Sequence, residues 1–211
     1  MTTSYEQTSL IKMSAFLLKD KMKVDKGFRR HEIARTHTGN VDHFDSPLGS
    51  LELISDGEHL IWLCFESGKF NIKEYDSFVL QEKSDSAIEK TKEWLSVYFS
   101  GIEPNFTPPL KIEGTDFMKV VLEILCSVPF GKTITYGELA KKTAAALGKQ
   151  KMSAQAIGNA VSRNPISIIV PCHRVIGSDG SLTGYAGGLE RKDWLLRNEG
   201  FSSAATTRLP R

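Results

Sequence analysis

The residues best suited to covalent chemistry are Cys172 and His173, which follow the apolar run 166–170 and Pro171. A thiolate is a strong nucleophile, and a nearby base or cation makes it available near neutral pH. A β-branched run that stops at a proline predicts a buried extended segment that meets a turn. Because neighbouring side chains in a strand point to opposite sides, contact between this cysteine and histidine requires a turn or helix start at Pro171. The pair alone does not identify a reactive site, because most single cysteines in soluble chains are inert core residues.

Three further motifs surround the pair: Asn164-Pro165 upstream, the segment 184–188 (Gly-Tyr-Ala-Gly-Gly) downstream, and the segment 194–200 (Trp-Leu-Leu-Arg-Asn-Glu-Gly) beyond it. The whole set resembles the O6-alkylguanine-DNA alkyltransferases, also called methylated-DNA–protein-cysteine methyltransferases. The resemblance runs, with one length change, from Gly114 to Gly200, and a weaker echo lies at residues 45–49.

The resemblance implies DNA repair by direct transfer of a methyl or alkyl group from O6 of guanine to Cys172, with no cofactor. It also implies O4-methylthymine as a second substrate. O6 lies inside the base pair, so the nucleotide must be rotated out of the stack. The product is a stable thioether, and each molecule is therefore expected to react once.

The resemblance also assigns roles to the residues around the nucleophile. His173 is the expected base, acting through a water, and Glu199 would hold its imidazole as the acid does in a Cys/His/acid triad. Tyr136 matches a tyrosine that donates to the flipped base and helps turn its phosphate, and Asn164 would brace the cysteine loop. The expected pocket wall consists of Val175, Tyr185 and Ala186. Simple core packing remains an alternative for Tyr185.

Two capped helices joined by a Gly-containing loop favour a helix-turn-helix. Thr135 and Glu138 form a capping box, and Ser153 caps the next helix. The small residues Ala154 and Gly158 allow close approach, either by a neighbouring helix or by DNA. The resemblance favours DNA, entered through the minor groove. The residues expected to bind DNA are Tyr136, Gly137, Ser153, Ala154, Gln155, Gly158, Asn159, Arg163 and Ser178.

Two features depart from the family pattern. Gln155 stands where relatives usually place an arginine that fills the gap left by the extruded base. A glutamine can hydrogen-bond to the orphaned cytosine but brings no charge, so weaker flipping and a shallower salt dependence are expected. The loop Thr143 to Met152 is also longer than in familiar members, and one of its lysines could partly replace the missing charge.

The charge of the chain is unevenly divided. Residues 1–108 hold 13 Lys+Arg against 17 Asp+Glu (net −4), whereas residues 109–211 hold 14 against 8 (net +6). The half with the cysteine motif is thus the basic half, as expected of a module that binds a polyanion. The three cysteines form no even framework and no C-x-x-C pair, which favours free thiols in a reducing compartment. No apolar run is long enough to span a membrane.

The expected fold is an α/β N-terminal domain (a small antiparallel sheet with helices) followed by a mainly α, winged-helix-like C-terminal domain with the helix-turn-helix. Short strands are predicted between residues 41 and 65, a helix from Ser84-Asp85 to Gly101, and a helix capped by Thr115 and ended by 129–131. Residues 66–84 are weakly patterned. The predicted divisions are an N-terminal extension of unknown role (1–40), a scaffold domain (41–108) and a DNA-binding and alkyl-transfer domain (109–211).

Other function classes fit less well. A protein that binds alkylguanine without accepting the group needs no Cys172, and a helix-turn-helix regulator does not account for the four residues Asn164, His173, Tyr185 and Glu199 together. A Cys-His hydrolase would need an oxyanion-hole glycine pattern, which is not visible. His31, His37 and His43 fit no zinc spacing, so we expect no metal. The expected protein is a monomer that acts on double-stranded DNA, in the nucleus of a eukaryote or otherwise in the cytoplasm.

Overall fold

The computed structural model describes residues 37–68 and 78–201 of the 211-residue chain. Most of the predicted N-terminal extension, including His31, lies outside the described residues. Within the described part, no helix has the length and apolar character that crossing a membrane requires.

The first half of the described chain is built on a four-stranded sheet in the order β3-β2-β1-β4. Its strands are β1 (His37–Ser46), β2 (Gly49–Ser55), β3 (Leu60–Phe65) and β4 (Phe78–Glu82). The first three are antiparallel neighbours, but β4 pairs in parallel with β1. The sheet is therefore mixed, which corrects the predicted antiparallel sheet. The strand β4 was missed because its segment carries no clear alternation, and it pairs with β1 at the far edge instead of with its chain neighbour β3.

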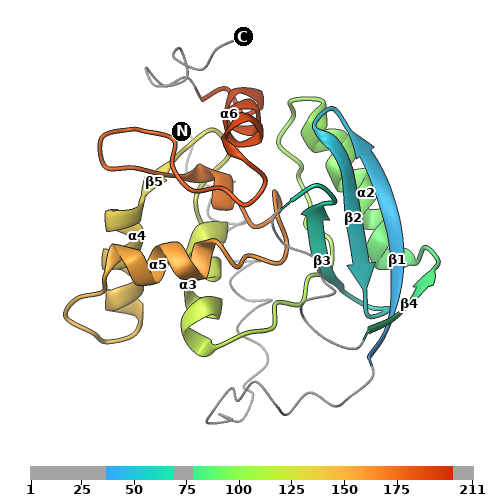
Figure 1. Ribbon diagram of the computed structural model, residues 1–211, viewed down its shortest axis with the longest axis horizontal. Coiled ribbons are helices and arrows are strands. Elements are labelled where there is room, and N and C mark those ends of the chain that lie inside the picture. Colours follow the sequence, from blue (N-terminus) through green and yellow to red (C-terminus); the bar gives the residue numbers. More distant parts are fainter. Residues whose placement is uncertain (1–36, 69–77, 202–211) are drawn as a thin grey trace. The chain divides into compact units, whose positions relative to one another are not determined.

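Helix α2 (Ser86–Phe99) packs against this sheet (Figure 1). It begins as predicted at Asp85, whose Oδ1 accepts hydrogen bonds from the backbone N–H groups of Ala87 (2.9 Å) and Ile88 (3.0 Å). Its buried face carries Ile88, Leu95 and Tyr98, which join the same hydrophobic cluster as the sheet. Each fully buried side chain of this size contributes about 1.5–3 kcal/mol.

The second half contains α3 (Asp116–Cys126), α4 (Tyr136–Ala146), α5 (Ala154–Val161) and α6 (Leu189–Asn198), with the short parallel pair β5 (Ile134–Thr135) and β6 (Val175–Ile176). Helices α3, α4 and α5 pack on one another. The predicted caps are confirmed: Thr115 caps α3, Thr135 and Glu138 form the capping box of α4, and Ser153 caps α5. Local capping chemistry thus fixes where the helix-turn-helix elements begin.

Two predicted boundaries are wrong. Helix α3 ends at Cys126 with Ser127 as its C-cap, before the proline and glycine of 129–131. Helix α4 continues to Ala146, so the predicted loop Thr143 to Met152 begins later. Thr143 is buried inside the helix, and its hydroxyl donates to the carbonyl of Leu139 (2.8 Å), which lets a polar residue continue the helix.

Candidate active site

The segment that leads to Cys172 is attached to the N-terminal sheet. The backbone N–H of Leu63 in β3 donates to the carbonyl of Pro165 (2.9 Å), and the N–H of Ser167 donates back to the carbonyl of Leu63 (2.7 Å). Beyond Ile166, which forms the isolated bridge with Leu63, the chain turns. The predicted extended segment is therefore wrong past this point. Ile168 has φ +70°, a left-handed conformation that a β-branched residue adopts only under constraint.

Asn164 supplies that constraint. Its Nδ2 donates to the carbonyl of Val170 (2.8 Å) and to Sγ of Cys172 (3.1 Å), and its Oδ1 accepts from the N–H of Ile166 (3.0 Å). One buried side chain therefore closes the turn through two backbone bonds and also contacts the sulfur. A donor aimed at sulfur favours the thiolate over the thiol.

Cys172 and His173 lie in η2 (Cys172–Arg174), a single 3₁₀ turn that begins after Pro171. The helix start that the sequence required at this proline is thus present. Cys172 is only 5% exposed. Burial raises the pKa of its thiol, and the hydrogen bond from Asn164 and the positive charge of Lys192 oppose that rise.

Lys192 on α6 is the cation beside this cysteine, and it was not among the predicted site residues. It is fully buried, and its Nζ donates to the carbonyls of Val175 and Thr183, both at 2.5 Å. Burial lowers the pKa of Lys192 to about 8, and the negative charge of a Cys172 thiolate acts in the opposite direction. A buried ammonium held by two neutral carbonyls retains uncompensated positive charge, which favours a thiolate nearby.

His173 is fully buried and paired with Glu199 through its Nε2, which lies 2.6 Å from Oε1. Burial lowers the pKa of His173, and the hydrogen bond and charge of Glu199 oppose that effect. Because an ionised carboxylate only accepts, Nε2 must carry the proton, and in neutral imidazole Nδ1 then holds the lone pair. Nδ1 is buried and has no hydrogen-bond partner among the described residues. The tautomer is therefore that of a base whose free acceptor is Nδ1.

Glu199, the C-cap residue of α6, accepts five hydrogen bonds. Its Oε1 accepts from His173, from the Tyr98 hydroxyl (2.8 Å) and from Nη2 of Arg174 (3.0 Å). Its Oε2 accepts from Nε of Arg174 (2.8 Å) and from the backbone N–H of Gly131 (3.1 Å). Burial alone would raise the pKa of Glu199, but the donors from His173 and Arg174 outweigh it and lower this pKa to about 2.

Of the predicted wall residues, Val175 donates its backbone N–H to the carbonyl of Cys172. Val175 and Tyr185 are buried, and Ala186 is half-buried. The Tyr185 hydroxyl is buried without a hydrogen-bond partner among the described residues. Burial raises the pKa of Tyr185 well above its ordinary value, and Cys172 adds to this effect. A packing residue would normally have its hydroxyl bonded, so this orphan is better suited to an incoming ligand.

Tyr136, the first residue of α4, lies between α5 and the segment 184–188. A Cβ added at Gly158 would lie 3.9 Å from its ring, and one added at Gly184 would lie 3.1 Å from its hydroxyl. That hydroxyl is 3.4 Å from the carbonyls of both Thr183 and Gly184, at the long limit for a hydrogen bond. Tyr136 is thus adjacent to the site but only weakly tethered.

The predicted DNA-binding residues of the two helices and their flanks share one property: with the exception of the half-buried Tyr136 and Gly158, they are exposed. The exposed ones are Gly137, Ser153, Ala154, Gln155, Asn159, Arg163 and Ser178. Ile157, Ala160 and Val161 form the opposite, buried face of α5. Nε2 of Gln155 lies 3.5 Å from Oδ1 of Asn159, so this side chain rests on its own helix.

Arg191, which was not among the predicted site residues, joins the sheet to the segment 184–188. Its Nε donates to the carbonyl of Leu48 (2.9 Å), Nη1 to that of Gly187 (3.1 Å), and Nη2 to the hydroxyl of Ser67 (2.8 Å). The guanidinium also lies over the ring of Phe65, 4.3 Å from its centroid. Through Arg191, the β1–β2 turn and the residues that follow β3 thereby hold the segment 184–188 in place.

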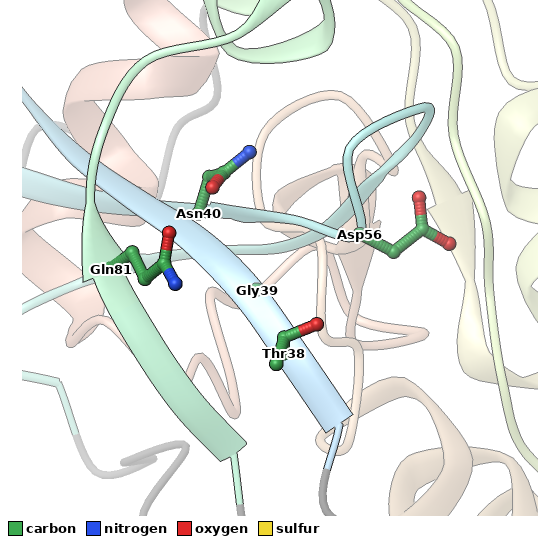
Figure 2. A pocket seen from close by; sticks show the side chains of 5 residues that line it. All are labelled: Thr38, Gly39, Asn40, Asp56 and Gln81. Atoms are coloured by element: carbon green, nitrogen blue, oxygen red, sulfur yellow. The ribbon is translucent and has the colours of Figure 1, made fainter.

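The remaining candidates show no comparable arrangement. Burial raises the pKa of both Cys64 and Cys126 to about 12. Among the described residues, no three His, Cys, Asp or Glu side chains gather as metal ligands would. A hollow of about 190 Å³ at the β1–β4 side of the sheet is lined by none of the predicted site residues (Figure 2). Asn40 in its lining donates to the capping residue Asp85 (2.7 Å), which gives that side chain a structural role.

Comparisons with known proteins show the family of the chain. Residues 42–112 match the family described as "6-O-methylguanine DNA methyltransferase, ribonuclease-like domain", and residues 116–201 match its "DNA binding domain". A methylated-DNA–protein-cysteine methyltransferase of Methanosarcina acetivorans is 45% identical over 74% of the chain and 96% of its own length. One of Haemophilus influenzae is 38% identical, over 74% and 84%. The crystal structure of Mycobacterium tuberculosis OGT in complex with DNA has a TM-score of 0.67 and 37% identity, covering 76% of this chain and 93% of that one.

Proposed function

Because the chain belongs to the 6-O-methylguanine DNA methyltransferase family, we propose that it repairs DNA by transferring the alkyl group of O6-alkylguanine to Cys172. The enzyme is a methylated-DNA–protein-cysteine methyltransferase that acts once per molecule, because the thioether has no ready route back. The observation that carries the assignment of the acceptor is the buried constellation of Asn164 and Lys192 beside the sulfur and Glu199 behind His173.

We assign activation of the nucleophile to His173. Burial favours the protonated thiol of Cys172, so the thiol proton must be removed during the reaction. Nδ1 of His173 is the free acceptor, and a bridging water relays the proton to it. The resulting imidazolium is paired with Glu199, and the thiolate faces the donor Asn164 and the cation Lys192.

The transfer itself is a displacement at the alkyl carbon. The sulfur lone pair forms the new S–C bond while the C–O6 bond breaks, and its electron pair leaves with the guanine. The purine departs as an anion unless a donor meets it, and Tyr136 is the donor we assign. We assign the recognition of the base to Val175, Tyr185 and Ala186, with the orphan hydroxyl of Tyr185 as one polar contact.

We propose that the exposed face of α5 binds the minor groove of duplex DNA. Its small residues Ala154 and Gly158 permit close approach, and Arg163 at the end of the helix meets the phosphates. The crystal structure of a relative in complex with DNA supports DNA as the partner. The relatives named above come from archaea and bacteria, which favours the cytoplasm as the compartment.

The test is to measure how much O6-methylguanine is converted to guanine. A duplex that contains one O6-methylguanine should yield unmodified guanine in an intact strand, in an amount equal to the protein added. Cys126→Ser is the matched control and should behave like the wild type. Stable binding of the duplex with the lesion unchanged would instead support the non-catalytic, alkylguanine-binding alternative.

A further inference from the structure

Tyr98 belongs to α2 of the N-terminal half, yet its hydroxyl reaches the carboxylate that orients His173. The hydroxyl donates to Oε1 of Glu199 (2.8 Å), and Nδ2 of Asn198 donates to the backbone carbonyl of Tyr98 (2.8 Å). Two consecutive residues at the end of α6 therefore hold this tyrosine at its backbone and at its ring tip.

Packing alone explains the ring but not the hydroxyl. The ring is fully buried, stacks on Trp94 (5.2 Å between centroids) and meets Phe130 and His173 edge to face at 6.0 and 6.4 Å. A phenylalanine would make the same contacts. Burying a hydroxyl is favourable only when it is bonded, and this one is bonded to the acidic residue of the site.

The hydroxyl competes with His173 for one oxygen atom. Oε1 of Glu199 accepts from Nε2 of His173 at 2.6 Å and from Tyr98 at 2.8 Å, whereas the tyrosine oxygen lies 3.4 Å from Nε2. A tyrosine hydroxyl has a single proton, and the shorter contact assigns it to the carboxylate. Each donor that shares the oxygen reduces the negative charge felt by the other.

We propose that Tyr98 is a positioning residue for alkyl transfer: by sharing Oε1 of Glu199 with His173, it limits how strongly the carboxylate favours the imidazolium. This inference rests on the proposed function. Its consequence is that His173 stays neutral, and its Nδ1 free to accept a proton, over a wider range of pH. The titratable and charged groups that face His173 come from α2, η2 and α6, and they are Tyr98, Cys172, Arg174, Lys192 and Glu199.

The sign of the effect follows from the hydrogen bonds. When the hydroxyl is removed, Glu199 loses one donor, its charge falls more fully on His173, and the imidazolium is favoured. The pKa of His173 then rises, and a base that must start neutral loses activity at higher pH than before. A shift of roughly half to one pH unit corresponds to a roughly three- to tenfold slower transfer on the acid limb.

The experiment is the single-turnover transfer rate of Tyr98→Phe, with a duplex containing O6-methylguanine, from about pH 5 to about pH 9. We expect the acid limb to move to higher pH, with a rate within about twofold of the wild type on the plateau. Trp94→Phe is the control, because Trp94 stacks on the same ring outside the set of donors to Glu199; it should leave the limb in place. If Tyr98→Phe slows transfer but leaves the acid limb of the pH–rate profile at the wild-type pH, the proposal is wrong and Tyr98 serves only in packing.

A second readout separates this inference from the proposed function. Nitrogen NMR of the histidine rings should show His173 as the Nε2–H tautomer, with a higher pKa in Tyr98→Phe, whether or not DNA is repaired. In the wild type, the Tyr98 hydroxyl proton should shift as His173 titrates, which needs no variant. An unchanged pKa in the variant, or a hydroxyl proton that ignores the titration, would overturn the proposal.

Discussion

Replacing Glu199 by glutamine perturbs the most connected side chain of the site. The carboxylate accepts from His173, Tyr98 and Arg174 on Oε1, and from Arg174 and Gly131 on Oε2. A glutamine keeps one acceptor oxygen and places an NH₂ group at the other position. At least two of the present donor groups, one of them an N–H of the Arg174 guanidinium, would then point at the NH₂ group and lose their acceptor.

The expected cost is large because the pair is buried. The Glu199 side chain is fully inaccessible and that of Arg174 is 11% exposed, so the guanidinium would keep only the carbonyl of Val128 (2.6 Å) and a neutral amide. Breaking one side of a buried ion pair costs about 3–5 kcal/mol. This is about a fifth or more of the stability of a typical domain, about 5–15 kcal/mol.

The same change removes the negative charge that stabilises the imidazolium of His173 during proton transfer. General-base catalysis contributes about 10²–10⁴-fold, so we expect alkyl transfer to slow by a factor in this range. Urea unfolding gives the free energy of unfolding, and single-turnover transfer gives the rate at a temperature where the variant is folded.

Glu190→Gln is the matched control, because Glu190 is an exposed acid in the first turn of the same helix, α6. Its free energy of unfolding should stay within about 0.5 kcal/mol of the wild type. A Glu199→Gln protein that loses less than about 1 kcal/mol and transfers at the wild-type rate would refute the role of the buried carboxylate.

The remaining predictions concern charge. Lys192→Met removes the cation beside Cys172, so the pKa of the thiol should rise and transfer at neutral pH should slow; an unchanged pH–rate profile would contradict this. Gln155→Arg should tighten binding to duplex DNA and steepen the dependence of log K on log salt by about one unit, as measured by titration at several salt concentrations. Weaker binding by that variant would count against the placement. Stability should fall in acid: the folded-state pKa of Glu199 is about 2 against an ordinary 4.5, so its contribution is complete above 4.5 and disappears as pH falls through 2. The pKa of His173 is also lowered, which adds a loss below 6.5. Urea unfolding across this range should show the decline, and Glu199→Gln should flatten its lower part.

Features determined by neighbouring residues could be predicted from the sequence. The caps at Thr115, Thr135 and Ser153 are local interactions, in which a side-chain oxygen accepts from the N–H three residues on. The turn at Pro171 was likewise required by the adjacency of Cys172 and His173. The helix starts of the helix-turn-helix and the turn at the cysteine motif could therefore be predicted from the sequence.

Features that depend on distant parts of the chain were not predicted. Strand β4 is defined by its pairing with β1, and the turn at Ile168 by the side chain of Asn164. Tyr98 lies within the helix predicted from Ser84-Asp85 to Gly101, and nothing local indicates that its hydroxyl meets a carboxylate 101 residues away. Lys192 did leave a signal, because it is a charged residue at helical spacing from the buried Leu195 and Leu196.

The central claim is that one sulfur atom, that of Cys172, receives the alkyl group. The most direct measurement is the mass of the intact protein after exposure to an excess of duplex containing O6-methylguanine, followed by mapping of the modified peptide. We predict a gain of one methyl group per chain, located on Cys172, and no gain in Cys172→Ser. A methyl group on another residue, or repair of the lesion by Cys172→Ser, would contradict the account.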